Sequence, residues 1–116
     1  MTEQRSALIV DDEHDIRELL VVTLGRMGLR TDSAPNLAVA REMLSTVAYD
    51  LCLTDMRLPD GSGLELVNEI ATRFPTTPVA VITAYGNVEA AVEALKGGAF
   101  DFVTKPVDLT VLRGLV

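Results

Sequence analysis

The stretch DLCLTDMRLPDGSGLELV, residues 50–67, holds a strand, a turn and the start of a helix in direct succession. Residues 51–54 form a short, almost continuously apolar run, which is typical of a strand covered on both faces of a parallel sheet. The turn-forming residues 59–61 (PDG) follow and change the direction of the chain. Ser62 and Glu65 then have the spacing of a capping box, whose side chains satisfy the first free amides of a helix. The stretch therefore predicts a strand–loop–helix unit.

Further strands and helices are expected on both sides of this unit. Apolar runs occupy residues 7–10, 79–82 and 100–103, and a more polar candidate strand occupies residues 29–33. A fifth helix is expected to begin near Val107. Between the runs, mostly apolar residues recur at the spacing of amphipathic helices. These residues are, helix by helix, Ile16, Leu20, Thr23, Leu24 and Met27; Leu37, Ala40, Met43, Leu44 and Val47; Leu64, Val67, Ile70 and Ala71; and Val88, Ala91, Val92 and Leu95.

This alternation predicts an α/β fold, with a parallel sheet that has helices on both faces. We expect five βα units, the last helix being cut short because the sequence stops at Val116. Residues 29–33 are polar and residues 100–103 alternate in polarity, so both runs suit the edges of the sheet, where a strand is only partly buried. No internal repeat or linker is visible, and we interpret residues 1–116 as a single domain.

The composition argues against two classes of function. The 116 residues include 17 acidic and 10 basic side chains, which gives a net charge of −7. That balance does not suit a nucleic-acid-binding surface, because phosphate binding depends on Lys and Arg. No apolar stretch approaches the roughly 20 residues of a membrane span, and no signal peptide is visible. We therefore expect a cytoplasmic protein, and we expect that this domain binds neither nucleic acid nor membranes directly.

Polar residues stand at the ends of four expected strands: Asp11 and Asp12, Asp55, Thr83, and Lys105. In a parallel sheet these ends meet at one edge, where ligands of such folds bind. Two carboxylates about 4 Å apart repel each other by roughly 4 kcal/mol at an effective dielectric constant near 20. Three of them therefore require either that one stays protonated or that a cation joins them. Mg²⁺ prefers oxygen ligands and combines one or two carboxylates with phosphate oxygens. The sequence predicts a Mg²⁺ site with room for a phosphoryl group.

Each of these residues, taken singly, has a simpler interpretation. An Asp that follows a strand is often the N-cap of the next helix. A Thr in that position is common, and a Lys is usually solvated. The prediction therefore depends on all of them standing at strand ends together.

Four blocks of the sequence resemble the signature blocks of response-regulator receiver domains of bacterial two-component systems. The blocks are LIVDDE (8–13), LTDMRLPDGSGLEL (53–66), VAVITAYG (79–86) and FDFVTKP (100–106), and the intervals between them also agree. The resemblance covers essentially the whole chain. It implies a flavodoxin-like (CheY-like), doubly wound sheet of five parallel strands in the order 2-1-3-4-5.

The resemblance also implies roles for the acidic residues. Asp55 is expected to be the phosphorylated residue. Asp12 and Asp55 are expected to bind Mg²⁺ directly, together with the backbone carbonyl of Arg57, whereas Asp11 would act through a metal-bound water.

Other roles implied by the resemblance concern the phosphoryl group and its effect. Thr83 and Lys105 are expected to contact phosphoryl oxygens. Thr83 and Phe102 are expected to form the conformational switch, and Arg57 and Tyr85 to tune the lifetime of the acyl phosphate.

A closer resemblance is to receivers of NtrC-class regulators, carried by AYGNVEAAVEALKGGAFDFVTKPVDL (84–109). Within that class the sequence looks like regulators of type IV pilus genes. The implied partners are a sensor histidine kinase and the protein's own effector region, an AAA+ ATPase that acts on RNA polymerase with the sigma factor RpoN, followed by a helix-turn-helix. A homodimer is compatible with this class. The domain would be a phosphoacceptor that assists its own phosphorylation and dephosphorylation, and not an enzyme.

Three alternative functions fit the sequence less well. A phosphatase with an Asp nucleophile typically has a second Asp two residues later, but Glu13 and His14 occupy those positions after Asp11 and Asp12. A flavin carrier of the same fold would need a hydroxyl- and Gly-rich loop after the first strand, where acidic residues would repel its phosphate. A receiver-like module that is never phosphorylated is disfavoured by the complete set of site residues.

Overall fold

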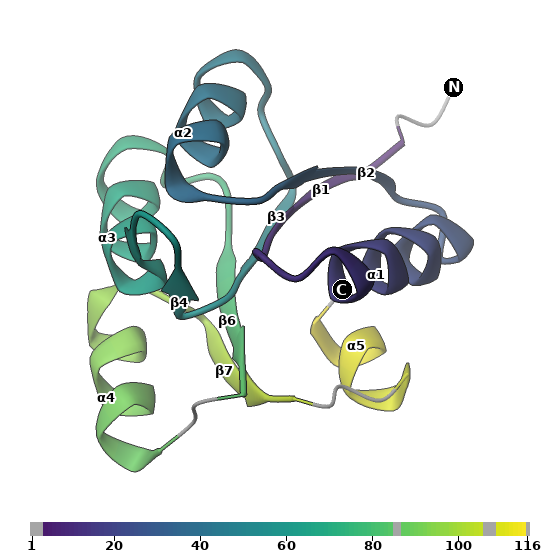
Figure 1. Ribbon diagram of the computed structural model, residues 1–116. Coiled ribbons are helices and arrows are strands. Elements are labelled where there is room, and N and C mark those ends of the chain that lie inside the picture. The colour runs from purple at the N-terminus through teal and green to yellow at the C-terminus, as the bar shows by residue number, and fades with distance from the viewer. Residues whose placement is uncertain (1–3, 85–86, 106–108, 116) are drawn as a thin grey trace.

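The computed structural model describes residues 4–84, 87–105 and 109–115, in which strands and helices alternate as expected (Figure 1). The elements are β1 (Ser6–Val10), α1 (His14–Arg26), β2 (Arg30–Ala34), α2 (Leu37–Thr46), β3 (Leu51–Thr54), β4 (Arg57–Leu58), β5 (Gly61–Ser62), α3 (Gly63–Arg73), β6 (Val79–Thr83), α4 (Val88–Gly97), β7 (Asp101–Thr104) and α5 (Leu109–Leu115). No helix in this part of the chain is both long and apolar enough to cross a membrane.

The five longer strands form one sheet in the order β2-β1-β3-β6-β7, and every neighbouring pair is parallel. Since β6 and β7 are the fourth and fifth of these strands along the chain, the predicted order 2-1-3-4-5 is confirmed. The polar strand β2 and the alternating strand β7 lie at the two edges, as their sequences indicated. Helices α1 and α5 cover one face of the sheet, and α2, α3 and α4 cover the other (Figure 1).

The core consists of two apolar layers, one on each face of the sheet. In β1, Leu8 and Val10 belong to the layer under α2 and α3, whereas Ala7 and Ile9 belong to the layer under α1 and α5. All four side chains are at most 1% exposed. This two-sided burial explains why the central strands are continuously apolar.

Three details of the sequence prediction were wrong. Strands β2 and β7 each begin and end one residue later than the predicted runs 29–33 and 100–103. Leu29 lies buried before β2, while Phe100 is 44% exposed before β7. The two-residue strands β4 and β5 form an antiparallel hairpin that was not predicted, because such short pairs leave no periodic pattern.

The buried faces of the later helices were also assigned partly wrongly. On α4, Val88, Val92 and Leu95 are 80%, 43% and 49% exposed, and Ala94 is the buried residue. In α3 the predicted Ala71 is exposed, whereas Leu66 is buried. Apolar periodicity reveals a helix but does not establish that its large side chains face the sheet. The predicted start of the last helix at Val107 falls outside the described residues.

Asp60, in the turn between β4 and β5, links this hairpin to the distant helix α2. Its carboxylate accepts hydrogen bonds from the backbone N–H groups of Leu37 (2.9 Å) and Ala38 (3.0 Å). The helix already has Asn36 as its N-cap, whose side chain accepts from Val39 N–H. The hairpin is therefore tied to the start of α2 by two charge-assisted hydrogen bonds.

We expect Asp60→Asn to destabilise the protein at neutral pH and to matter less in acid. The hydrogen bond from Leu37 lowers the pKa of Asp60 below its ordinary 3.8. A carboxyl whose folded-state pKa is lowered contributes stability above its unfolded-state pKa and loses it as the pH falls through the folded-state value. Urea unfolding of both proteins between about pH 7 and about pH 2 measures this difference. A difference in the free energy of unfolding between the two proteins that stays constant with pH would contradict the assigned role of the carboxylate.

Candidate phosphoacceptor site

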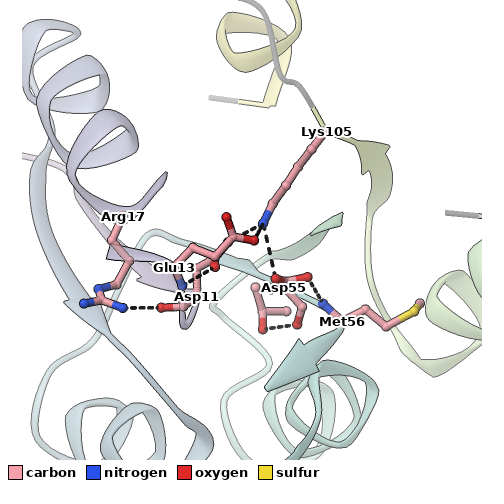
Figure 2. A network of polar contacts seen from close by, with 7 residues as sticks. Asp11, Glu13, Arg17, Asp55, Met56 and Lys105 are labelled. Atoms are coloured by element: carbon pink, nitrogen blue, oxygen red, sulfur yellow. Dashed lines mark hydrogen bonds and ion pairs between the residues drawn. The ribbon is translucent and has the colours of Figure 1, made fainter. Parts of the chain in front are cut away.

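Lys105 joins two buried aspartates at the carboxyl edge of the sheet (Figure 2). Its Nζ lies 2.7 Å from Asp11 Oδ2, 3.2 Å from Asp55 Oδ2 and 3.8 Å from Glu13 Oε1. The side chains of Lys105, Asp11 and Asp55 are 9%, 3% and 4% exposed, so these ion pairs are largely withdrawn from water. The predicted convergence of residues 11, 55 and 105 is thus present in the structure.

The acidic partners of Lys105 stabilise its charged form. Burial acts to lower the pKa of this ammonium, but the hydrogen bond to Asp11 and the charges of Asp11 and Asp55 outweigh it and raise the pKa above its ordinary 10.5. Lys105 is therefore a permanent cation at the site at physiological pH.

The hydrogen bonds of the sheet fix the positions of Asp11, Asp55 and Lys105 along the strand direction. Just beyond the strand ends, Asp11 N–H donates to Ala34 O (3.1 Å), Asp55 N–H to Val10 O (2.8 Å) and Lys105 N–H to Thr83 O (2.8 Å). These bonds continue the parallel hydrogen-bonding ladder. The first residues after β1, β3 and β7 are thereby held at one level on the same edge.

The loop after β3 is packed tightly against the start of α3. Gly63 N–H donates to Met56 O (2.7 Å), and Met56 N–H donates to Asp55 Oδ1 (2.7 Å). A Cβ atom on Gly63 would overlap the carbonyl oxygen of Asp55. A glycine at the first position of the helix is therefore required for the observed close approach to the site.

The acidic residues form a donor set that fits a hard cation. Asp11, Asp12, Glu13 and Asp55 each place a carboxylate oxygen so that the four atoms lie within 4.8 Å of one another. Asp12 and Glu13 are exposed, so water molecules have access to complete a coordination shell. Oxygen ligands of this kind suit Mg²⁺ or Ca²⁺. Glu13 was not predicted as part of the site, although it directly follows the two aspartates in LIVDDE.

The remaining predicted residues are placed as follows. Thr83 is fully buried at the end of β6, at the level of Thr104 in β7. Phe102 is half-buried and packs against the core layer under α2 and α3. Arg57 is exposed at the start of β4, two residues after Asp55. Tyr85 lies outside the described residues, and its predicted role stays a prediction.

Comparison with protein families identifies the kind of domain. The response regulator receiver domain model matches residues 7–116. The chain is 66% identical over 113 residues to the response regulator protein PilR of Pseudomonas aeruginosa, covering 97% of this chain and 25% of that protein. It is 38% identical over 108 residues to the DNA-binding transcriptional regulator NtrC of Escherichia coli, covering 93% of this chain and 23% of that protein. The chain thus spans about a quarter of the length of these relatives.

Solved structures agree with this assignment. A response regulator from Burkholderia pseudomallei, with a phosphorylated aspartic acid, calcium ion and citrate, matches with a TM-score of 0.91 at 25% identity, over 96% of this chain and 65% of the other. The beryllofluoride-activated NtrC4 receiver domain dimer matches with a TM-score of 0.86 at 32% identity, over 95% of each chain. The predicted resemblance to NtrC-class regulators, and within them to PilR, is confirmed, and the chain belongs to the response regulator receiver domain family of two-component systems.

Proposed function

We propose that Asp55 accepts a phosphoryl group from the phosphohistidine of a sensor kinase in a Mg²⁺-dependent reaction. The observation that carries this proposal is the buried Asp55 carboxylate, which is bound to Lys105 at an edge shared with Asp11 and Asp12. An isolated buried carboxylate would be costly. Here the ammonium group of Lys105 compensates one charge, and the other carboxylates leave a surplus of negative charge that a divalent cation would neutralise.

In the proposed reaction an oxygen of Asp55 attacks phosphorus as the P–N bond of the phosphohistidine breaks, and the electron pair of that bond returns to the ring nitrogen. Lys105 stands 3.2 Å from Asp55 Oδ2, so its positive charge can follow the transferred oxygens. Mg²⁺, when bound, would neutralise negative charge on those oxygens. The contribution of the protein is positioning and electrostatic stabilisation, as in other phosphoryl transfers.

The donor set suggests how the ion would be held. Asp12 and Asp55 would bind Mg²⁺ directly with the backbone carbonyl of Arg57, and Asp11 would act through a bound water. The calcium ion and phosphorylated aspartic acid of the Burkholderia pseudomallei structure support a cation in this chemistry. Lys105 remains compatible with the ion, because it already contacts Asp11 and Asp55 and can turn toward the phosphoryl group.

Phosphorylation would then act on a two-state switch. We propose that Thr83 moves toward the phosphoryl group and that Phe102 turns into the vacated space, which shifts the population of two conformations. Arg57 and Tyr85 would tune the lifetime of the acyl phosphate. The output would be control of an attached AAA+ RpoN-dependent transcription activator, with a homodimer as one active form. The domain would act as a phosphoacceptor in the cytoplasm and not as an enzyme that turns over a substrate.

The proposal is tested by intact-mass spectrometry after treatment with acetyl phosphate. We expect the addition of one phosphoryl group to the wild-type chain when Mg²⁺ is present, and none when Mg²⁺ is removed with a chelator. Asp55→Asn should show no addition, because the amide is not a competent nucleophile. Equal labelling of the wild type and Asp55→Asn would rule out the proposed role of Asp55. Equal labelling with and without Mg²⁺ would rule out the proposed dependence on Mg²⁺.

A further inference from the structure

Within the described part of the chain, the carboxylate of Asp12 is held differently from those of Asp11 and Asp55. It makes no hydrogen bond or ion pair with residues 4–84, 87–105 or 109–115, whereas Asp11 and Asp55 are each held by Lys105. Glu13, the N-cap residue of α1, makes no capping hydrogen bond with its side chain either. The direction in which Asp12 points toward the cation site is therefore set by the backbone that carries it.

That backbone is held from outside the acidic cluster by Arg17. The guanidinium Nη1 of Arg17 donates to the carbonyl oxygen of Asp11 at 2.7 Å, as Figure 2 shows. Arg17 lies in the first turn of α1, where its own N–H donates to Glu13 O at 3.0 Å. A hydrogen bond from a charged donor is stronger than one between neutral groups, so this contact is a firm anchor for the loop.

The position of this anchor matters because a peptide unit is planar. The carbonyl of Asp11 belongs to the same rigid plane as the nitrogen and Cα of Asp12. The N–H of Asp11 is fixed by Ala34 O at 3.1 Å, so Arg17 fixes the next peptide unit. Orienting this carbonyl therefore orients the bond from which the Asp12 side chain departs.

We infer that Arg17 is a positioning residue for the cation site, acting through the Asp11 carbonyl on the carboxylate of Asp12. This inference rests on the proposed function, since it presumes that Asp12 binds the cation. Outer contacts that orient metal ligands typically contribute 10–100-fold to metal affinity. Arg17 itself touches neither the cation nor the phosphoryl group.

The sign of the effect separates positioning from simple charge. A guanidinium near the site repels a divalent cation, so loss of its charge alone would tighten Mg²⁺ binding. Loss of an orienting hydrogen bond would weaken Mg²⁺ binding. The two interpretations of Arg17 thus predict opposite changes in the dissociation constant.

The experiment is a Mg²⁺ titration of Arg17→Met. Binding is measured by isothermal titration calorimetry and by the amide NMR shifts of Asp12 and Met56. We expect the dissociation constant for Mg²⁺ to rise about 10-fold. Arg26→Met is the matched control, because Arg26 lies in the last turn of the same helix. Its Mg²⁺ affinity should equal that of the wild type. An unchanged or tighter constant for Arg17→Met would overturn the inference.

One further measurement and a second variant make the outcome unambiguous. At saturating Mg²⁺, Arg17→Met should be phosphorylated by acetyl phosphate to the wild-type extent, because the acceptor is intact. If Arg17→Met does not fold, Arg17→Gln decides with the same criteria, since its shorter amide cannot reach the Asp11 carbonyl. A wild-type chain that binds no Mg²⁺ would refute the proposed function. Equal Mg²⁺ dissociation constants for the wild type, Arg17→Met and Arg26→Met would refute only the role of Arg17.

Discussion

Replacing Lys105 with Met is expected to lower the free energy of unfolding by about 3–5 kcal/mol in Mg²⁺-free buffer. The substitution keeps the apolar stem and removes the ammonium that lies between Asp11 and Asp55, both almost fully buried. Breaking a buried ion pair by removing one partner leaves an uncompensated charge, which is the costly case. Because the pKa of Lys105 is raised above 10.5, its contribution is complete below that value and is lost only in more alkaline solution.

Mg²⁺ should restore much of the stability that Lys105→Met loses. A cation that binds only the folded state stabilises it in proportion to the logarithm of its concentration. Urea unfolding with and without Mg²⁺ measures both effects, and Lys96→Met provides the control because Lys96 is exposed on α4. A loss below about 1 kcal/mol, the range of surface ion pairs, would contradict the buried geometry. A free energy of unfolding of Lys105→Met that does not rise with Mg²⁺ would contradict the cation site.

Gly63→Ala is expected to destabilise the protein by about 3 kcal/mol, at the upper end of the range for overpacking. The added Cβ would overlap the carbonyl oxygen of Asp55, which is backbone and cannot rotate away. Ala is favoured over Gly within helices by about 1 kcal/mol, so the steric effect opposes the propensity effect and should outweigh it. Relief of the overlap requires a shift of the Asp55 loop, so the rate of phosphorylation should also fall.

The matched control for this substitution is Gly25→Ala in α1. A Cβ on Gly25 would meet no atom within 4 Å apart from the neighbouring backbone of its own helix, so this change should stabilise the protein by about 0.5–1 kcal/mol. Thermal unfolding of both variants measures the contrast, and acetyl phosphate labelling measures the site. Equal stability of the two variants would show that α3 does not pack against the Asp55 loop as observed.

The parts of the site that follow from strand order could be predicted from the sequence. Asp11, Asp55 and Lys105 stand directly after the ends of strands that are apolar or alternate in a simple way, and parallel pairing then places them together. The capping box of Ser62 and Glu65 was equally visible, and the structure contains both of its hydrogen bonds. Local chemistry and topology were sufficient in these cases.

The contacts that stabilise the loops could not be predicted in the same way. Arg17 reaches back to a backbone carbonyl, and Asp60 caps a helix 23 residues away in sequence. Neither contact leaves a periodic signal, because each depends on how a loop folds after the sheet has formed. The buried face of α4 was also predicted wrongly. The small Ala94 faces inward, while Val88 and Leu95 face solvent.

The position of the phosphoryl group tests the central claim most directly. The protein is phosphorylated with acetyl phosphate and Mg²⁺, the acyl phosphate is reduced with borohydride, and tryptic peptides are sequenced by mass spectrometry. The peptide 42–57 contains Glu42, Asp50 and Asp55, and fragment ions distinguish the three. We predict reduction of the side chain at Asp55 alone, to the alcohol. Modification at Glu42, at Asp50, or at Asp11 and Asp12 in the peptide 6–17, with Asp55 unmodified, would contradict the account.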